Sequence, residues 1–473
     1  MDEDRNQNSE YEFNDEIIQR YEDSIRKNKK CYFDVSEFES IINHYINTNK
    51  FNSALEATNL AYKQHPTSTE IQLKKAQILI DKGQAIESLK ILKHIEKIES
   101  SNFEIFLLKG IISNILGNFN DAIVQFNRSL SLSNDDKYDL ICAIASSFEQ
   151  VGQYKTAISF LSKINGFKNE NSDILFEVAY CYEKNDEIDK SIYYYKKFLD
   201  FQPFSENGWF NLGILLNKQD KLEEANEAYD FAIAINEKFS LPYFNKANIF
   251  ANAGKYKEAI EVYTEYLLVE QNNSLANCYI GECYERLEQY DSALEYYKIA
   301  LELDKNNPDA WFGIGITKMY KEEYTESIDY VKKAIEIDDN NSEYWYILGN
   351  IYSNIGSFDE TISAYKKAIE LNSDEAEFWV SYSIFMFENN KLQDAINILN
   401  DSLKSLPDNA EICYRLAGFF LEDKNEEEAL KFFEKGIMAD YDRNKAFFKY
   451  CPQAKKLESF KNILKQYKPP KNK

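Results

Sequence analysis

The sequence has few of the residues that build catalytic or metal centres. Its 473 residues include only three histidines, His44, His65 and His94, which share no regular spacing. This leaves no histidine-based metal site and no triad that needs a histidine base. The seven cysteines are odd in number and lack Cys-x-x-Cys spacing, so we interpret them as reduced core residues. We therefore predict a protein with no cofactor and no metal that is not an enzyme.

Long apolar runs are also absent. The first ten residues are polar and acidic, without the apolar stretch of a secretory signal, and no run of about 18 apolar residues occurs anywhere. We therefore predict a soluble, cytoplasmic protein.

Tryptophan is scarce, and its placement is informative. Trp311, Trp345 and Trp379 are 34 residues apart, and Trp209 precedes Trp311 by 102 residues, three times this spacing. A fixed period of this length indicates a stack of repeated supersecondary units. With each tryptophan set as position 4, twelve repeats cover Val35 to Arg443, and one step alone is 35 residues long. The anchors are Phe38, Gln72, Phe106, Ile141, Leu175, Trp209, Tyr243, Asn277, Trp311, Trp345, Trp379 and Cys413.

Three further positions of the repeat predict a pair of helices joined by a tight turn. Position 8 is small in most repeats, as in Gly213 and Gly349, and position 20 is small in all of them, which lets two helices approach closely. Position 15 is suited to a left-handed residue that ends the first helix. It carries Gly83, Gly117, Gly152, Gly254 and Gly356, with Asn49, Asp186, Asp220 and Asn390 elsewhere.

At these residues the chain resembles the tetratricopeptide repeat family, whose pattern is W-x2-L-G-x2-Y followed by alanine, an aromatic residue, alanine and proline. The best matches are Trp209, Leu212, Gly213, Ala225, Tyr229 and Ala232, and Trp345, Leu348, Gly349, Tyr352, Tyr365 and Ala368. The resemblance implies an all-α fold: an α-solenoid of twelve helix-turn-helix repeats in a right-handed superhelix, with capping helices at both ends.

The residues outside the array divide into two ends. We predict that residues 1–34 form an acidic arm, disordered to about residue 13, in which Asn14 caps a short helix with Ile17, Ile18, Tyr21 and Ile25 on one stripe. This helix is predicted to cover the first repeat, and a peptide-like docking arm is the alternative. Residues 444–473 form a basic end. Here a capping helix from Gln453 to Tyr467 places Ala454, Leu457, Phe460, Leu464 and Tyr467 on one face, followed by a frayed tail.

Charge limits the partners of the array. The net charge is −24. Residues 1–34 carry −4 and residues 444–473 carry +8, so residues 35–443 carry −28. Such a surface repels nucleic acid and anionic membranes and favours a basic or mixed-charge protein. Acidity that serves solubility alone is the alternative.

The resemblance also places a binding surface. In this family the first helices line a concave groove, and Glu177, Glu282 and Glu285 in this groove would favour basic ligand residues. The partner-binding residues predicted in this way are Phe176, Tyr180, Phe210, Asn211, Phe244, Asn245, Asn248, Tyr279, Glu282, Phe312, Tyr346 and Asn350. The alternative for each aromatic residue is that it packs between neighbouring first helices.

We therefore predict a non-catalytic scaffold that binds an extended or helical segment of another protein in its groove. The alternative function is that of a structural or assembly subunit, or a self-associating scaffold, which uses its ends or its convex face. The pair Gly313 and Gly315 is predicted to lie within a helix as packing residues and not in a phosphate-binding turn. The oligomeric state is left open.

Overall fold

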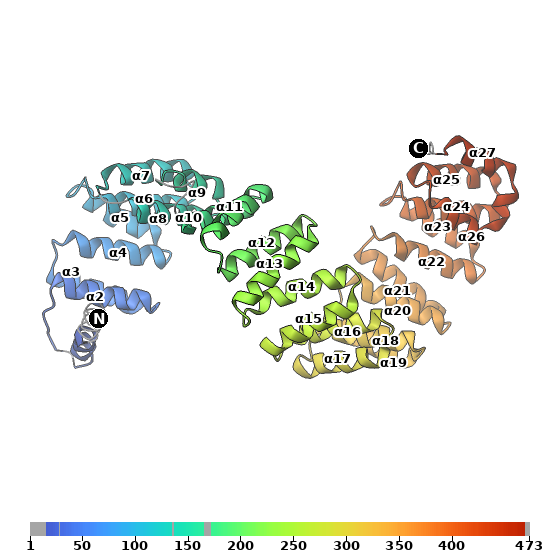
Figure 1. Cartoon of the computed structure of the whole chain (residues 1–473), viewed down its shortest axis with the longest axis horizontal. Coiled ribbons are helices and arrows are strands. Elements are labelled where there is room, and N and C mark those ends of the chain that lie inside the picture. Colours follow the sequence, from blue (N-terminus) through green and yellow to red (C-terminus); the bar gives the residue numbers. More distant parts are fainter. Residues whose placement is uncertain (1–15, 28, 135–136, 165–171, 469–473) are drawn as a thin grey trace. The chain divides into compact units, whose positions relative to one another are not determined.

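The computed structural model describes residues 16–27, 29–134, 137–164 and 172–468, and every regular element in these ranges is a helix (Figure 1). The predicted all-α fold is confirmed. Helix pairs follow one another from α2 to α25, which gives twelve pairs within the described ranges. The predicted disordered start and the predicted cap Asn14 lie outside these ranges, as does the tail from residue 469.

The helices divide into two compact units, Met1–Ile235 and Asn236–Lys473, and we describe each unit by itself. The first unit begins with a helix over residues 16–26. Its pairs are α2 (Val35–Asn47) with α3 (Phe51–Gln64), α4 (Thr69–Asp81) with α5 (Ala85–Ile95), α6 (Phe103–Ile115) with α7 (Phe119–Leu132), α8 (Tyr138–Glu149) with α9 (Tyr154–Leu161), α10 (Ser172–Lys184) with α11 (Ile188–Phe201), and α12 (Glu206–Lys218) with α13 (Leu222–Ile235).

The second unit has six pairs and three terminal elements. The pairs are α14 (Ser240–Asn252) with α15 (Tyr256–Val269), α16 (Ser274–Arg286) with α17 (Tyr290–Leu303), α18 (Pro308–Tyr320) with α19 (Tyr324–Ile337), α20 (Ser342–Asn354) with α21 (Phe358–Leu371), α22 (Ala376–Glu388) with α23 (Leu392–Ser402), and α24 (Ala410–Glu422) with α25 (Glu426–Ala439). The terminal elements are α26 (Asn444–Tyr450), the 3₁₀ helix η1 (Pro452–Lys456) and α27 (Glu458–Gln466).

Each pair is held together by a close contact between its two helices. Position 20 of every repeat is fully buried, whether it carries alanine, serine or threonine. Position 8 faces the ring at position 24: a Cβ added to Gly349 would lie 2.7 Å from the Tyr365 ring, and one added to Gly213 would lie 2.5 Å from that of Tyr229. No side chain fits in these gaps unless the ring moves. Small residues therefore set the separation of the two helices, as the sequence predicts.

Each tryptophan side chain is hydrogen-bonded to the turn that precedes its repeat. The indole Nε1 of Trp345 donates a hydrogen bond to the carbonyl oxygen of Asp339 at 3.1 Å, and Trp209 makes the same bond to Pro203 at 2.8 Å. Trp311 and Trp379 repeat the bond to a carbonyl six residues earlier. All four rings are half-buried, so they close the junction between pairs and do not fill its centre.

The two ends depart from prediction in detail. In the helix over residues 16–26, Ile17 and Tyr21 are buried, but Ile25 is 54% exposed and Ser24 is buried in its place. The prediction for Ile25 is wrong because Ile17, Tyr21 and Ser24 follow the i, i+4, i+7 spacing of a single face.

The predicted helix from Gln453 to Tyr467 is in fact two elements, η1 and α27, separated at Leu457. Pro452 stands at the first position of η1, where its fixed φ angle is tolerated. Packing still follows the prediction, since Ala454 and Phe460 are fully buried and Leu464 and Tyr467 lie against the same core.

The twelve residues at position 15 all have a positive φ angle. Nine of them are the glycine, asparagine and aspartate residues that the sequence singles out, and the other three are Glu288, Glu322 and Lys424. A left-handed conformation strains a residue with a bulky Cβ substituent.

We expect Glu322→Gly to stabilise the region of α18 and α19 by roughly 0.5–1 kcal/mol, because relief of backbone strain exceeds the added entropy of the unfolded chain. Amide hydrogen exchange in these helices during urea titration measures the gain. The matched control, Glu322→Ala, retains a Cβ and should give no gain. Equal shifts in the two variants would contradict the strain argument.

Candidate protein-binding faces

In both units, first helices of successive pairs lie against one another. Contacts of this kind join α2 to α4, α4 to α6 and α6 to α8 in the first unit, and α16 to α18, α18 to α20 and α22 to α24 in the second. Each unit therefore presents a layer of first helices, which we call its first-helix face. The predicted partner-binding residues divide between the two faces: Phe176, Tyr180, Phe210 and Asn211 belong to the first unit and the other eight to the second.

The predicted aromatic residues are of two kinds. Phe210, Phe312 and Tyr346 are buried, with 9%, 8% and 9% of their surface exposed, so they serve chiefly as packing residues between helices. Phe176, Tyr180, Phe244 and Tyr279 are half-buried. The Tyr279 ring stacks on Tyr263 with 5.8 Å between centroids and leaves part of its surface accessible.

The asparagine side chains are engaged within the repeat. Tyr365 donates its hydroxyl hydrogen bond to Oδ1 of Asn350 at 2.7 Å, and Tyr263 makes the equivalent bond to Asn248. Asn211 Nδ2 donates to the hydroxyl of Tyr195 at 3.1 Å. A tyrosine hydroxyl in the core needs such a partner. Tyr263, Tyr365 and Tyr195 thereby occupy one hydrogen-bonding group on each of these three amides.

A row of carboxylates at position 2 is the clearest feature of the second unit's first-helix face. We call Asp309, Glu343, Glu377 and Glu411, on α18, α20, α22 and α24, the carboxylate row. Asp309 accepts a hydrogen bond from the Tyr344 hydroxyl at 2.7 Å, and Glu377 accepts one from Tyr346 at 2.9 Å. The hydroxyl of the buried Tyr346 therefore helps to position the Glu377 carboxylate.

The row carries a negative potential that the protein only partly neutralises. Desolvation raises the pKa of Glu343, and the charges of Glu282, Asp309 and Glu377 raise it further, against the opposing effect of Arg286. Glu411 pairs with Arg443 at 2.7 Å. The other three members of the row, Asp309, Glu343 and Glu377, are exposed and make no ion pair within the described ranges.

The sequence reasoning missed this row, although a signal for it was present. Position 2 is acidic in eight of the twelve repeats, four consecutive ones in each unit. The first unit's equivalents are Glu70, Glu104, Asp139 and Asp173. Counting charge by repeat position, and not over the whole array, would have found both rows.

Glu285, on α16, is half-buried. Its carboxylate Oε2 accepts a hydrogen bond from the Tyr297 hydroxyl at 3.3 Å and lies 3.5 Å from the Thr317 hydroxyl. Burial raises the pKa of Glu285 from 4.5 to about 7. The predicted groove residue Glu285 is thus a core group, whereas Glu282, on the same helix, is exposed and lies 3.8 Å from Arg286.

Because its folded-state pKa is raised, Glu285 destabilises the protein as pH rises through the interval from 4.5 to about 7. We expect Glu285→Gln to remove this pH dependence. Between pH 4.5 and 8, the free energy of unfolding of the variant should therefore rise by on the order of 3 kcal/mol relative to that of the parent. Urea unfolding at several pH values, with hydrogen exchange in α16–α18, measures the difference. Glu302→Gln, exposed on α17, is the control. Parallel stability curves for parent and Glu285→Gln would disprove the assignment.

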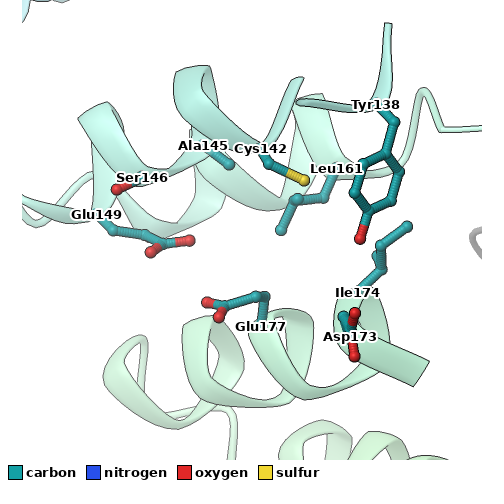
Figure 2. A pocket seen from close by; sticks show the side chains of 9 residues that line it. All are labelled: Tyr138, Cys142, Ala145, Ser146, Glu149, Leu161, Asp173, Ile174 and Glu177. Carbon is teal, nitrogen blue, oxygen red and sulfur yellow. The ribbon is translucent and has the colours of Figure 1, made fainter. Parts of the chain in front are cut away.

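The first unit holds a cavity of about 370 Å³ between α8 and α10, with Leu161 of α9 at its wall. Figure 2 shows Glu149 of α8 and Glu177 of α10 with their carboxylates directed toward one another across the open space. Burial raises the pKa of both, and the charge of Glu149 also raises that of Glu177. Glu149 accepts a hydrogen bond from Cys181 Sγ at 3.2 Å.

The described ranges show no convergence of three or more metal-ligating side chains. Gly313 and Gly315 lie within α18, where added Cβ atoms would lie 2.3 Å from the Tyr297 ring and 2.5 Å from Val331, so they are packing residues as predicted. In the same ranges, no helix combines the length and the apolar character needed to cross a membrane.

Together, the helix pairs and their first-helix faces define a helical-repeat protein. Three family models described as tetratricopeptide repeat match it: one at residues 286–351 and 386–447, a second at 342–375, and a third at 210–276 and 244–310. The chain is a tetratricopeptide repeat protein, as the sequence indicates. Proteins of this family typically mediate protein–protein interactions.

Solved structures of the same family show similarity as well. Yeast Tom70 is 18% identical, with 92% of this chain and 98% of that chain covered at a TM-score of 0.45. Cut9–Hcn1 from the APC/C is 16% identical, and the match covers 81% of this chain and 89% of that chain at a TM-score of 0.41. YrrB, described as having an unusual peptide-binding site, is 23% identical, and the match covers 39% of this chain and 95% of that chain at a TM-score of 0.33. No curated protein sequence matches the chain.

Proposed function

We propose that this protein is a non-catalytic scaffold that binds a lysine- or arginine-bearing segment of another protein along the first-helix face of the second unit. The carboxylate row supports this proposal most directly. Its members repeat at one position on four successive first helices, so they would meet successive basic side chains of one extended or helical segment.

Accessible aromatic rings at the other ends of the same first helices, about 15 Å along the helix from the row, add apolar contact area. Tyr320, at the end of α18, is 53% exposed, and Phe387 on α22 is 37% exposed and stacks on Phe419 with 5.0 Å between centroids. Rigid rings contribute contact area at a small cost in conformational entropy. They can also hold a cation over the ring face.

The thiols support a function without nucleophilic catalysis. Burial raises the pKa of Cys283 to about 12 and that of Cys451 to about 11, and it raises that of Cys278 as well. A nucleophilic cysteine needs the opposite shift, since the thiolate is the reactive form.

We expect Asp309→Asn, Glu343→Gln and Glu377→Gln combined to weaken the binding of a labelled peptide of alternating glycine and lysine by roughly tenfold, since each lost charge contact is worth up to about 1 kcal/mol. Fluorescence anisotropy measures the affinity, with an alternating glycine–glutamate peptide as the negative control.

A matched variant tests whether net charge alone is responsible. Glu302→Gln, Glu336→Gln and Glu370→Gln remove the same three charges from exposed positions on the second helices α17, α19 and α21. We expect this variant to bind as the parent does. Equal weakening in the two triple variants, or no binding by the parent, would refute the proposal.

A second candidate function, self-association, is favoured by the basic end of the second unit. Exposed lysines cover α26, η1 and α27, while Phe460 and Ala454 beneath them are buried. These lysines are Lys445, Lys449, Lys455, Lys456, Lys461, Lys465 and Lys468. Such a patch complements the carboxylate row of a second copy.

If copies associate in this way, we expect the apparent mass from light scattering to fall toward that of a monomer as salt rises from roughly 0.05 to 0.5 M, because screening weakens contacts between exposed charges. Lys455→Gln and Lys456→Gln together should lower the mass at low salt. A mass that does not change with salt would exclude this mode of association.

A further inference from the structure

The cavity between α8 and α10 has two different walls. One end carries the carboxylates of Glu149 and Glu177. The remainder is lined by Ala145, Leu161, Ile174 and the Tyr138 ring, together with Cys142, Ser146 and the Asp173 carboxylate (Figure 2). A space of about 370 Å³ accommodates a long side chain. An occupant must therefore combine an apolar stem with a group that satisfies two carboxylates.

The two carboxylates lack a cationic partner within the described ranges. Neither Glu149 nor Glu177 makes an ion pair there, although the same unit pairs Glu183 with Lys184 at 3.3 Å and Glu187 with Lys190. The thiol of Cys181 is the donor that Glu149 has within the protein. Two facing carboxylates in a partly desolvated space repel one another, and a cation between them removes this cost.

We propose that this cavity receives the side chain of a lysine or arginine from a bound segment of another protein. The aliphatic stem lies against Leu161 and Ile174, and the charged end lies between Glu149 and Glu177. This inference rests on the proposed function, because it places a basic residue of a protein partner on the first-helix face of the first unit. It identifies a particular residue class and the groups that recognise it.

Cys142 offers a direct test, since its side chain lines the cavity. The protein is equilibrated with cystamine and 2-hydroxyethyl disulfide in the presence of their thiols. By thiol–disulfide exchange, Cys142 then forms a mixed disulfide that carries either an aminoethyl or a hydroxyethyl group. The two groups are matched in size and differ in charge. Peptide mass mapping gives the ratio of the two adducts, and Cys31, which is also partly exposed, provides the internal reference.

We expect the aminoethyl adduct to be favoured at Cys142 by about tenfold relative to Cys31, in keeping with a charge-assisted contact in a partly buried site. Glu149→Gln with Glu177→Gln should reduce this preference to the level at Cys31. Glu70→Gln with Glu104→Gln removes two charges from first helices α4 and α6 of the same unit and should leave it unchanged. No preference in the parent, or one that survives in Glu149→Gln with Glu177→Gln, overturns the proposal.

The adduct ratio requires no partner, so it can succeed or fail independently of peptide binding to the second unit. The occupant is tested by adding the alternating glycine–lysine peptide at saturating concentration. We expect modification of Cys142 by cystamine to slow about tenfold relative to Cys31, because a lysine then fills the cavity. An unchanged rate would mean that a lysine side chain does not enter, and would overturn the assignment. The parent protein suffices for this arm if a variant does not fold.

Discussion

The close approach of the two helices in each pair is the constraint on which the rest of the structure depends. A fully buried small residue at position 20 and a small residue at position 8 bring the helices together beneath the ring at position 24. The left-handed residue at position 15 then begins the turn between the helices, with a φ angle between 55° and 75° in every repeat. Because these contacts recur with one period, successive pairs within each unit present their first helices on a common face.

The same packing decides which polar groups are available to a partner. Large tyrosines at position 24 fill the pair, and their buried hydroxyls must be hydrogen-bonded. Asn248 and Asn350 provide this bond for Tyr263 and Tyr365, so part of their capacity is committed to the protein itself. Position 2 lies at the start of each first helix, where Asp309 and Glu377 accept hydrogen bonds from buried tyrosines and are themselves exposed. It can therefore carry charge at little cost to packing, and acidic residues occupy it in both units.

Charge and shape are combined differently in the two units. In the second unit the carboxylate row is exposed and extends over four helices, an arrangement suited to a segment that runs across them. In the first unit two carboxylates face one another within a cavity with an apolar wall, which suits one side chain. Arg443 pairs with Glu411 at one end of the row, and Arg286 opposes the rise in the pKa of Glu343. Glu149, by contrast, accepts a hydrogen bond from the thiol of Cys181 and has Glu177 opposite it.

The sequence by itself determined the repeat and the helical class, because the backbone needs of a tight turn and a close helix contact restrict residue type at positions 8, 15 and 20. It also located the terminal packing residues Ala454 and Phe460. Tertiary structure alone decided how each polar or aromatic side chain is used. Phe312 and Tyr346 are buried, Glu285 is a core group, and Glu149 faces Glu177, because these outcomes depend on contacts between neighbouring helices that a 34-residue period does not specify. Ile25 was missed because Ser24, and not Ile25, continues the buried face of Ile17 and Tyr21. The break at Leu457 was missed because apolar spacing does not distinguish a 3₁₀ helix followed by an α-helix from one continuous helix.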